Sequence, residues 1–96
     1  MADVTISRNR DRSRYEAEIE GRAAGFADYS EEEGVVVMPH TEVFPEFEGQ
    51  GVGGALVRRA LDDVRAAGFT VDPVCPFVAG WIEKHPDYQD LVTGPR

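Results

Sequence analysis

Residues 48–55 read Glu-Gly-Gln-Gly-Val-Gly-Gly-Ala, so four glycines stand directly before a segment with the apolar spacing of a helix. Glycine permits φ > 0 and close approach of the backbone, which lets successive N–H groups point at one anion. The helix N-terminus adds partial positive charge there. The helix is predicted to end before Gly68, and its apolar positions are Val52, Leu56, Val57, Ala60, Leu61, Val64 and Ala67.

Two well-known glycine signatures fit this loop poorly. A nucleoside triphosphate loop ends in Gly-Lys-Ser/Thr, whereas the corresponding letters here are Gly-Gly-Ala. Gly49, Gly51 and Gly54 satisfy the G-x-G-x-x-G spacing of a dinucleotide loop, and Asp72 lies about twenty residues on. Only one β-α-β unit follows, however, and the remaining chain is too short for that fold. Neither nucleotide class is therefore favoured by the glycines alone.

The rest of the chain alternates in the manner of strands before the loop and becomes helical after it. The predicted strands are about 4–6, 15–19, 23–29, 35–38 and 69–71, and the predicted helices are 52–67 and 78–85. Gly21-Arg22 and the acidic segment 30–34 are expected to be turns, and the fifth strand should run parallel to its predecessor. The order β-β-β-β-α-β-α predicts an α/β (α+β) fold with a mostly antiparallel sheet of about five strands and two helices.

The loop can also be parsed as Gln50-x-x-Gly53-x-Ala55. This resembles the Q/R-x-x-G-x-G/A pyrophosphate loop of the GCN5-related N-acetyltransferases (GNAT). The resemblance extends to residues 40–43, 73–78 and 81–92, and it covers about 36–92 in all. Together these stretches resemble the small single-domain branch of that superfamily, of the YjdJ-like type. Together these stretches are far more specific for the family than the glycine pattern alone.

The resemblance implies a binding site for acetyl-coenzyme A. The pyrophosphate is expected on the amides of residues 50–55, with the pantetheine arm along the strand that carries Met38 to Val43. The implied cofactor-binding residues are Val43, Gln50, Gly51, Val52, Gly53, Gly54 and Ala55. Compared with ordinary members, the chain lacks early helices that cover the acceptor, so an open acceptor site is expected. No metal is assigned.

Three side chains are candidates for the chemistry. His40 and Glu42 straddle Thr41, so they share one face of the strand, and either is a candidate general base; a strand-end histidine that only bonds the loop is the alternative for His40. Cys75 follows the fifth strand and is either an acyl acceptor or an inert buried thiol. His85, which precedes Pro86, is expected to end the last helix. Trp81 and Tyr88 are expected to pack against the sheet.

Composition bounds the remaining possibilities. Ninety-six residues predict one domain, 1–96, and the single cysteine excludes an internal disulfide. The sequence has neither a long apolar run nor a basic leader, which favours a cytoplasmic protein without a membrane partner. The net charge of −8 disfavours a nucleic-acid partner.

The acidity is uneven, because seven carboxylates and no Lys or Arg lie between Asp28 and Glu48. This segment either attracts a cationic amine or consists of solvated turns. The leading hypothesis is an acetyl-coenzyme A-dependent N-acetyltransferase that acts by direct transfer on a small-molecule or peptide amine. The alternatives are a coenzyme A or acyl-coenzyme A-binding module without turnover and an interaction domain with a vestigial loop. A monomer or weak homodimer is expected.

Overall fold

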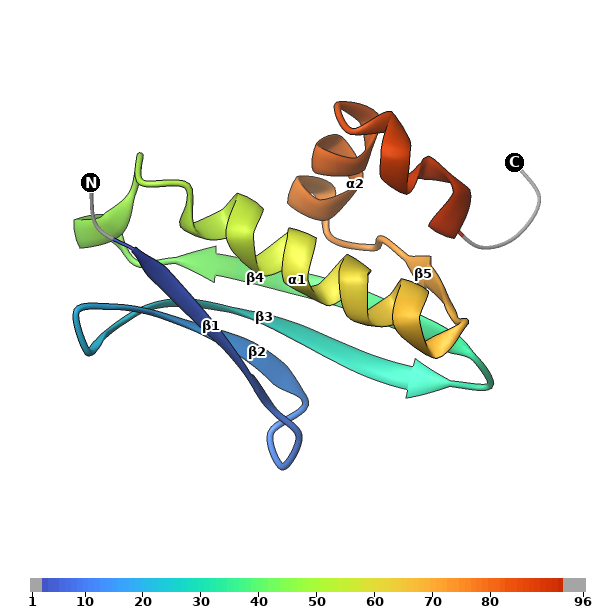
Figure 1. The fold of residues 1–96 in the computed structure, drawn as a ribbon, viewed down its shortest axis with the longest axis horizontal. Helices are drawn as coiled ribbons and strands as arrows, with labels where there is room; N and C mark the ends of the chain where they lie inside the picture. The colour runs from blue at the N-terminus through green and yellow to red at the C-terminus, as the bar shows by residue number, and fades with distance from the viewer. Residues whose placement is uncertain (1–2, 93–96) are drawn as a thin grey trace.

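The computed structural model describes residues 3–92. Met1 and Ala2, which belong to the N-terminal segment expected not to be a basic leader, lie outside the described residues. Five strands form one sheet in the order β1-β2-β3-β4-β5, antiparallel except for the parallel pair β4–β5 (Figure 1). The predicted fold class and element order are confirmed. The elements are β1 (Val4–Asn9), β2 (Arg14–Ile19), β3 (Arg22–Glu32), β4 (Val35–Val43), η1 (Pro45–Phe47), α1 (Val52–Ala67), β5 (Thr70–Asp72), α2 (Pro76–Glu83) and η2 (Pro86–Leu91).

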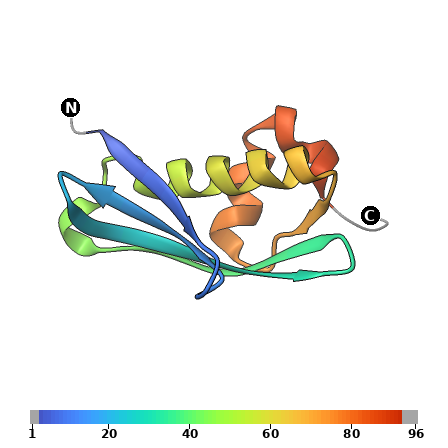
Figure 2. The ribbon, with the colours of Figure 1, turned by 60° about the horizontal axis from the view of Figure 1, so that its bottom comes forward.

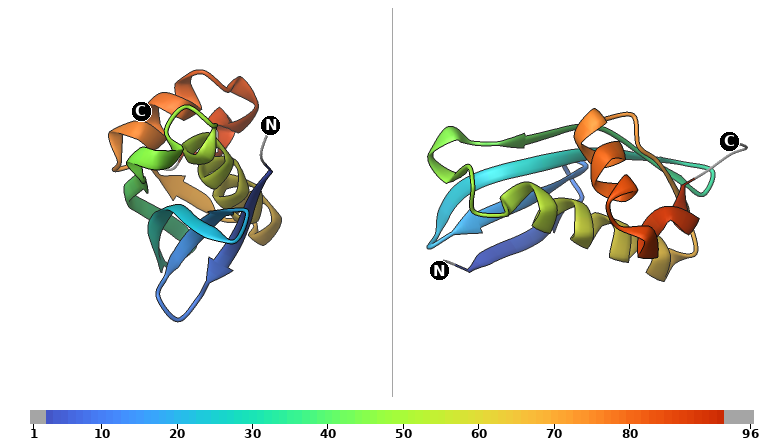
Figure 3. Two further views of the ribbon diagram at one scale, coloured as in Figure 1. Left: turned by 90° about the vertical axis from the view of Figure 1, so that its left-hand side faces the viewer. Right: turned by 90° about the horizontal axis from the view of Figure 1, so that it is seen from above.

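Both helices lie on one face of the sheet, and no helix of the described residues lies on the opposite face (Figures 2 and 3). The apolar stripe of α1 packs on the helix-bearing face, where Leu56 and Leu61 are fully buried in the same core cluster as Tyr15 and Ala17 of β2. Burial of one such leucine contributes about 1.5–3 kcal/mol. Neither helix of the described residues has the length and hydropathy needed to cross a bilayer.

The hairpin turns differ from those predicted. The β2–β3 turn is Glu20-Gly21, with φ of 52° and 78°, rather than Gly21-Arg22. The β3–β4 turn is Glu33-Gly34, so β3 extends to Glu32 and most of the acidic segment belongs to a strand. Positive φ at both central residues gives the twist that suits a two-residue hairpin. The prediction that the whole acidic segment 30–34 forms a turn was therefore wrong, because only Glu33 and Gly34 form it.

Helix α2 begins two residues before the predicted start and ends at Glu83. Pro76 occupies its first turn, where the missing N–H costs no hydrogen bond. The His85 ring stacks on Trp81 at 3.7 Å between centroids, and its Nδ1 donates to the Trp81 carbonyl at 2.6 Å. The helix therefore ends two residues before His85, which was predicted to end it; Lys84 is the C-cap of α2, and His85 is the N-cap of η2.

A bulge interrupts β4 near its middle. From Val37 to His40 the chain advances three residues, while their partners on β3, Ser30 and Asp28, are two residues apart. The extra residue lies in the segment that includes Pro39, which has no N–H to give to a ladder. The sequence analysis did not anticipate this bulge.

The bulge reverses which residues of β4 face α1. Before it, Met38 is fully buried on the helix side. Beyond it, Thr41 lies opposite the buried Ala27 and therefore also faces the helices. His40 and Glu42 consequently face the uncovered side of the sheet.

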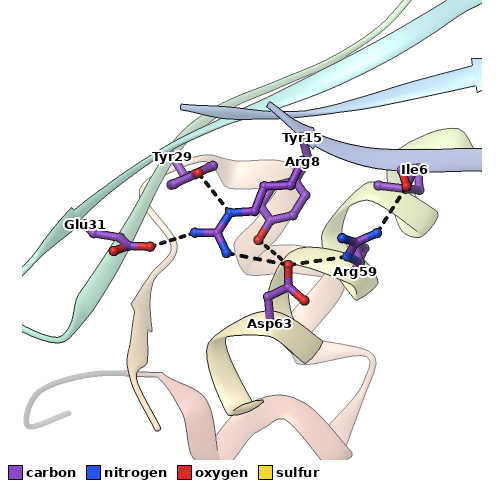
Figure 4. A network of polar contacts seen from close by, with 7 residues as sticks. All are labelled: Ile6, Arg8, Tyr15, Tyr29, Glu31, Arg59 and Asp63. Atoms are coloured by element: carbon purple, nitrogen blue, oxygen red, sulfur yellow. Dashed lines mark hydrogen bonds and ion pairs between the residues drawn. The ribbon is translucent and has the colours of Figure 1, made fainter. Parts of the chain in front are cut away.

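Polar side chains tie α1 to the N-terminal strands (Figure 4). Asp63 accepts a hydrogen bond of 2.7 Å from the hydroxyl of the buried Tyr15 and lies 3.8 Å from Arg8. Arg8 also donates to the Tyr29 hydroxyl at 2.9 Å and pairs with Glu31 at 2.7 Å. Asp63 of α1 is thus tied directly to β2, and through Arg8 of β1 it is linked to β3.

Arg59 completes this network. It donates to Asp63 at 3.3 Å and reaches the main-chain oxygen of Ile6 on β1 at 3.1 Å. Since β1 is an outer strand of the sheet, this contact joins α1 to the sheet edge.

Candidate functional site

The loop before α1 leaves main-chain donors without partners within the helix. Gly51 is the N-cap, adopts the left-handed conformation with φ 79°, and supplies no side-chain cap. The Ala55 N–H donates to the Gly51 carbonyl at 3.0 Å and is the first amide engaged in the helix. The N–H groups of Val52, Gly53 and Gly54 therefore precede the helical ladder. This is a narrower set than the predicted residues 50–55.

A pocket of about 240 Å³ opens at these amides. Its walls are the loop, the end of β4 and α2, and the lining residues are Val43, Glu48, Gly49, Gly51, Val52, Gly53, Gly54 and Phe77. Gln50 and Ala55 are not among them.

Two aromatic side chains of α2 explain why glycines are needed here. A Cβ on Gly53 would lie 2.7 Å from Cζ of Phe77, and one on Gly54 would lie 3.3 Å from Nε1 of Trp81. Glycine at these positions therefore lets the aromatic side chains of α2 pack closely on the start of α1.

Strand β4 has a free edge beside this pocket. It pairs with β5 only over residues 35–37. Beyond this pairing, the Cys75 N–H donates a hydrogen bond of 2.9 Å to the Met38 carbonyl. On the β3 side, Phe44 N–H donates to the Ala24 carbonyl. Alternate residues exchange hydrogen bonds in an antiparallel pair, so Thr41 and Val43 direct their main-chain groups to the free edge.

Cys75 lies where β4 and β5 separate. It is the N-cap of α2, is 5% exposed, and its Sγ lies 3.8 Å from the Thr41 hydroxyl. Burial acts to raise the pKa of the thiol. The N–H groups of Phe77 and Val78, with the hydroxyl and N–H of Thr41, outweigh burial and lower the pKa of Cys75 below its usual value. The site therefore stabilises a thiolate.

His40 and Glu42 form a separate pair on the uncovered face. His40 Nε2 lies 3.3 Å from Glu42 Oε1, and the two side chains are 55% and 49% exposed. Phe26 packs beside His40 with ring centroids 5.8 Å apart. The structure thus brings Val43 to the glycine loop and His40 to Glu42, but it places Cys75 on the other face from that pair.

Phe77, Thr41 and Glu48 also belong to the site, although none was singled out from the sequence. Phe77 is 47% exposed despite its size, and it covers Gly53. The sequence offers one indirect signal for it, the unusual accumulation of small residues in the first turn of α1. The contact between Thr41 and Cys75 depends on the bulge. Glu48 lines the pocket because it directly follows η1, where the chain turns toward the glycine loop.

A family model described as GCN5-related N-acetyl-transferase matches residues 14–91. A comparison with curated protein sequences finds no significant match. Among solved structures, a GCN5-like protein from Staphylococcus aureus is 24% identical with a TM-score of 0.75, covering 100% of this chain and 94% of its own.

Two larger proteins share the fold over about half their length. The ribosomal-protein-S18-alanine N-acetyltransferase of Escherichia coli is 18% identical with a TM-score of 0.63, and the match covers 74% of this chain and 49% of that one. A GNAT family acetyltransferase from Brucella melitensis, solved with acetyl-CoA, is 25% identical with a TM-score of 0.56, and the match covers 71% and 50%. Sequence match and fold agree that the chain belongs to the GCN5-related N-acetyltransferase family.

Proposed function

We propose that the protein transfers the acetyl group of acetyl-coenzyme A to a primary amine. The observation that carries this proposal is the row of three N–H groups at residues 52–54, which precede the first helical hydrogen bond of α1 and belong to residues that line a pocket together with Val43 at the end of β4. The Brucella relative that shares the fold was solved with acetyl-CoA.

The residues present fit a pyrophosphate. Helix-start amides without partners are strong donors to phosphate oxygens, and the helix dipole favours negative charge at the same point. The close approach of Phe77 to Gly53 leaves no room for a Cβ there. Glu48 is the unfavourable element, since its carboxylate lines the pocket and repels an anion.

Acetyl-coenzyme A would supply an activated thioester, so the protein mainly positions the reactants and manages one proton. A main-chain N–H at Thr41 or Val43, directed to the free edge of β4, is placed to polarise the acetyl carbonyl. The amine nitrogen forms a bond to the carbonyl carbon, the carbon–sulfur bond breaks, and the ammonium proton passes to a base. Glu42 or His40 fills that role from the uncovered face.

Cys75 offers a second route within the same function. Its lowered pKa and its place at the fork between β4 and β5 suit a thiolate that accepts the acetyl group and then passes it on. Direct transfer needs His40 or Glu42 and not the thiol, so Cys75→Ala separates the two routes.

A coenzyme A-binding module without turnover is the second candidate function. It is favoured by the separation of Cys75 from the His40–Glu42 pair, because no histidine or carboxylate contacts the thiol among the described residues. Both candidates predict binding, and only the enzyme predicts release of free thiol that depends on added amine.

Isothermal titration calorimetry with acetyl-coenzyme A tests the site, with Gly53→Ala as the variant and Gly80→Ala as its matched control. The added Cβ at Gly53 meets the Phe77 ring at 2.7 Å, whereas one at Gly80 meets nothing within 4 Å. We expect Gly53→Ala to weaken binding by about tenfold or more, equal to about 1.4 kcal/mol, and Gly80→Ala to leave it unchanged. Equal affinity in both variants, with the fold intact, would exclude this pocket.

A thiol-release assay with a panel of amines then distinguishes the enzyme from the binding module. Amine-dependent release that survives Cys75→Ala supports direct transfer, and its loss with retained binding supports the relay. Assignment to the YjdJ-like branch, a single domain over 1–96, a cytoplasmic location and a monomer or weak homodimer remain predictions. Size-exclusion chromatography with light scattering checks the last of these.

A further inference from the structure

The sheet face turned away from the helices is uncovered throughout the described strands (Figures 2 and 3). Register and alternation assign the residues that point to it, because the buried residues of β2, β3 and β5 fix the opposite face. The carboxylates on this face are Glu16, Glu18, Asp28, Glu32, Glu42 and Asp72.

This face is strongly negative. Six carboxylates stand on it, and the described strand positions that point the same way contribute a single arginine, Arg14. Arg14 is already engaged, since it pairs with Glu16 at 2.9 Å and lies 4.6 Å above the Phe26 ring. Carboxylates spread over a surface in this way attract an extended polycation rather than a single charge.

One end of the face is hollowed. A cavity of about 670 Å³ is lined by Glu32, Glu33, Val35, Val37 and Asp72. Two half-buried valines form its apolar part, and three carboxylates surround them. Lysine and arginine have the matching shape, because an alkyl stem packs on apolar surface while the charged head remains at a polar rim.

The proposed reaction centre lies along the same strand. His40 and Glu42 point to this face beyond the bulge, and the hollow is reached by following β4 back to Val35. Because of the bulge, the step from Val35 to His40 corresponds to four residues of β3, from Glu32 to Asp28, or roughly 13 Å of extended chain. An extended ligand along β4, whose alternate side chains point to one face, would therefore place two cationic groups about four residues apart.

We propose that this face docks a short, extended basic peptide, with its acceptor amine at His40–Glu42 and a second basic side chain in the Glu32–Asp72 hollow. This inference rests on the proposed acetyl transfer and narrows its acceptor to a peptide. Charge complementarity along the strand and the valine-lined hollow at its end select the peptide over a free monoamine.

Fluorescence anisotropy of a labelled synthetic peptide measures the docking without any turnover. The probe is a short peptide with a lysine and an arginine four positions apart in a glycine–serine background, compared with a peptide in which the two are adjacent. We expect the spaced peptide to bind more tightly, by about fivefold or more, and salt to weaken both.

The double variant Glu32→Gln with Asp72→Asn tests the hollow, and Asp87→Asn with Glu83→Gln is the control with the same change in net charge. Asp87 lies at the start of η2 and Glu83 at the end of α2, on the helix side of the sheet. We expect the first pair to weaken binding of the spaced peptide about tenfold and the control pair to change it less than twofold.

Equal losses in the two double variants, or equal binding of the two peptides, would overturn the proposal. Spermidine that binds as tightly as the spaced peptide, with the same sensitivity to Glu32→Gln and Asp72→Asn, would also overturn the peptide assignment. Calorimetry with acetyl-coenzyme A keeps the two proposals apart. A protein that binds acetyl-coenzyme A and acetylates simple amines but does not bind the peptide refutes the docking alone.

Discussion

The two ends of α1 are held in opposite ways. The C-terminal half is fixed by side chains, with Asp63 and Arg59 bonded to β1 and β2. The N-terminal end has no side-chain cap, and three amides precede its first hydrogen bond. One end thus stabilises the fold without a ligand, and the other retains donors that have no partner within the helix and are available to water or to a ligand. In α1, the residues expected to stabilise the fold therefore lie in the C-terminal half, and the amides expected to bind a ligand lie at the N-terminal end.

Asp63→Ala tests this separation with the largest expected effect. It removes the hydrogen-bond acceptor of the buried Tyr15 hydroxyl and a partner of both Arg8 and Arg59. We expect urea denaturation to show a loss of about 2–4 kcal/mol in the free energy of unfolding. Asp90→Asn, at an exposed pair with Arg65, is the control and should change stability little.

Acetyl-coenzyme A affinity of Asp63→Ala should match that of the unmodified protein at a temperature where both are folded. A parallel loss of affinity would show that the two ends of α1 are coupled.

Thr41→Val is expected to have the next largest effect, which is a change in the pKa of Cys75 at the start of α2. The Thr41 hydroxyl is among the groups that lower the pKa of Cys75 against the effect of burial. Its removal should raise that pKa, so that the thiolate forms at higher pH and makes up a smaller fraction at neutral pH. A pH titration of the thiolate ultraviolet absorbance measures the change, with Cys75→Ala as the blank.

Valine is nearly the same size as threonine and suits a strand, so the fold should persist. An unchanged titration curve would mean that the main-chain N–H groups at the start of α2 are sufficient to stabilise the thiolate.

Glu48→Gln should give the smallest effect. The carboxylate lines the pocket at the glycine loop, where it opposes a bound diphosphate. We expect its neutralisation to tighten acetyl-coenzyme A binding by about twofold to fourfold at low salt, and less at high salt. Glu46→Gln, two residues before Glu48 and paired with Arg22, is the control. Weaker binding in Glu48→Gln would mean that this side chain contacts the ligand favourably.

The element order and the bounds of α1 could be predicted because they depend on local pattern. The apolar spacing from Val52 to Val64 and the glycine after Ala67 specify a helix without reference to other parts of the chain. Pro76 was not used to place the start of α2, although proline in a first turn is such a local signal.

The arrangement of the site depended on register, which the sequence does not display. One extra residue near Pro39 turns His40 and Glu42 away from Cys75 and turns Thr41 toward it. The sequence analysis correctly put His40 and Glu42 on a common face. It had no means of identifying that face, because the partner strand and the bulge are set by tertiary pairing.

The bond from Arg59 to the Ile6 carbonyl has a consequence for solubility. An incoming strand from another molecule would need the outward main-chain acceptors of β1, and a guanidinium already occupies one of them. Arg59 therefore disfavours the addition of a strand from another molecule to the open edge of β1.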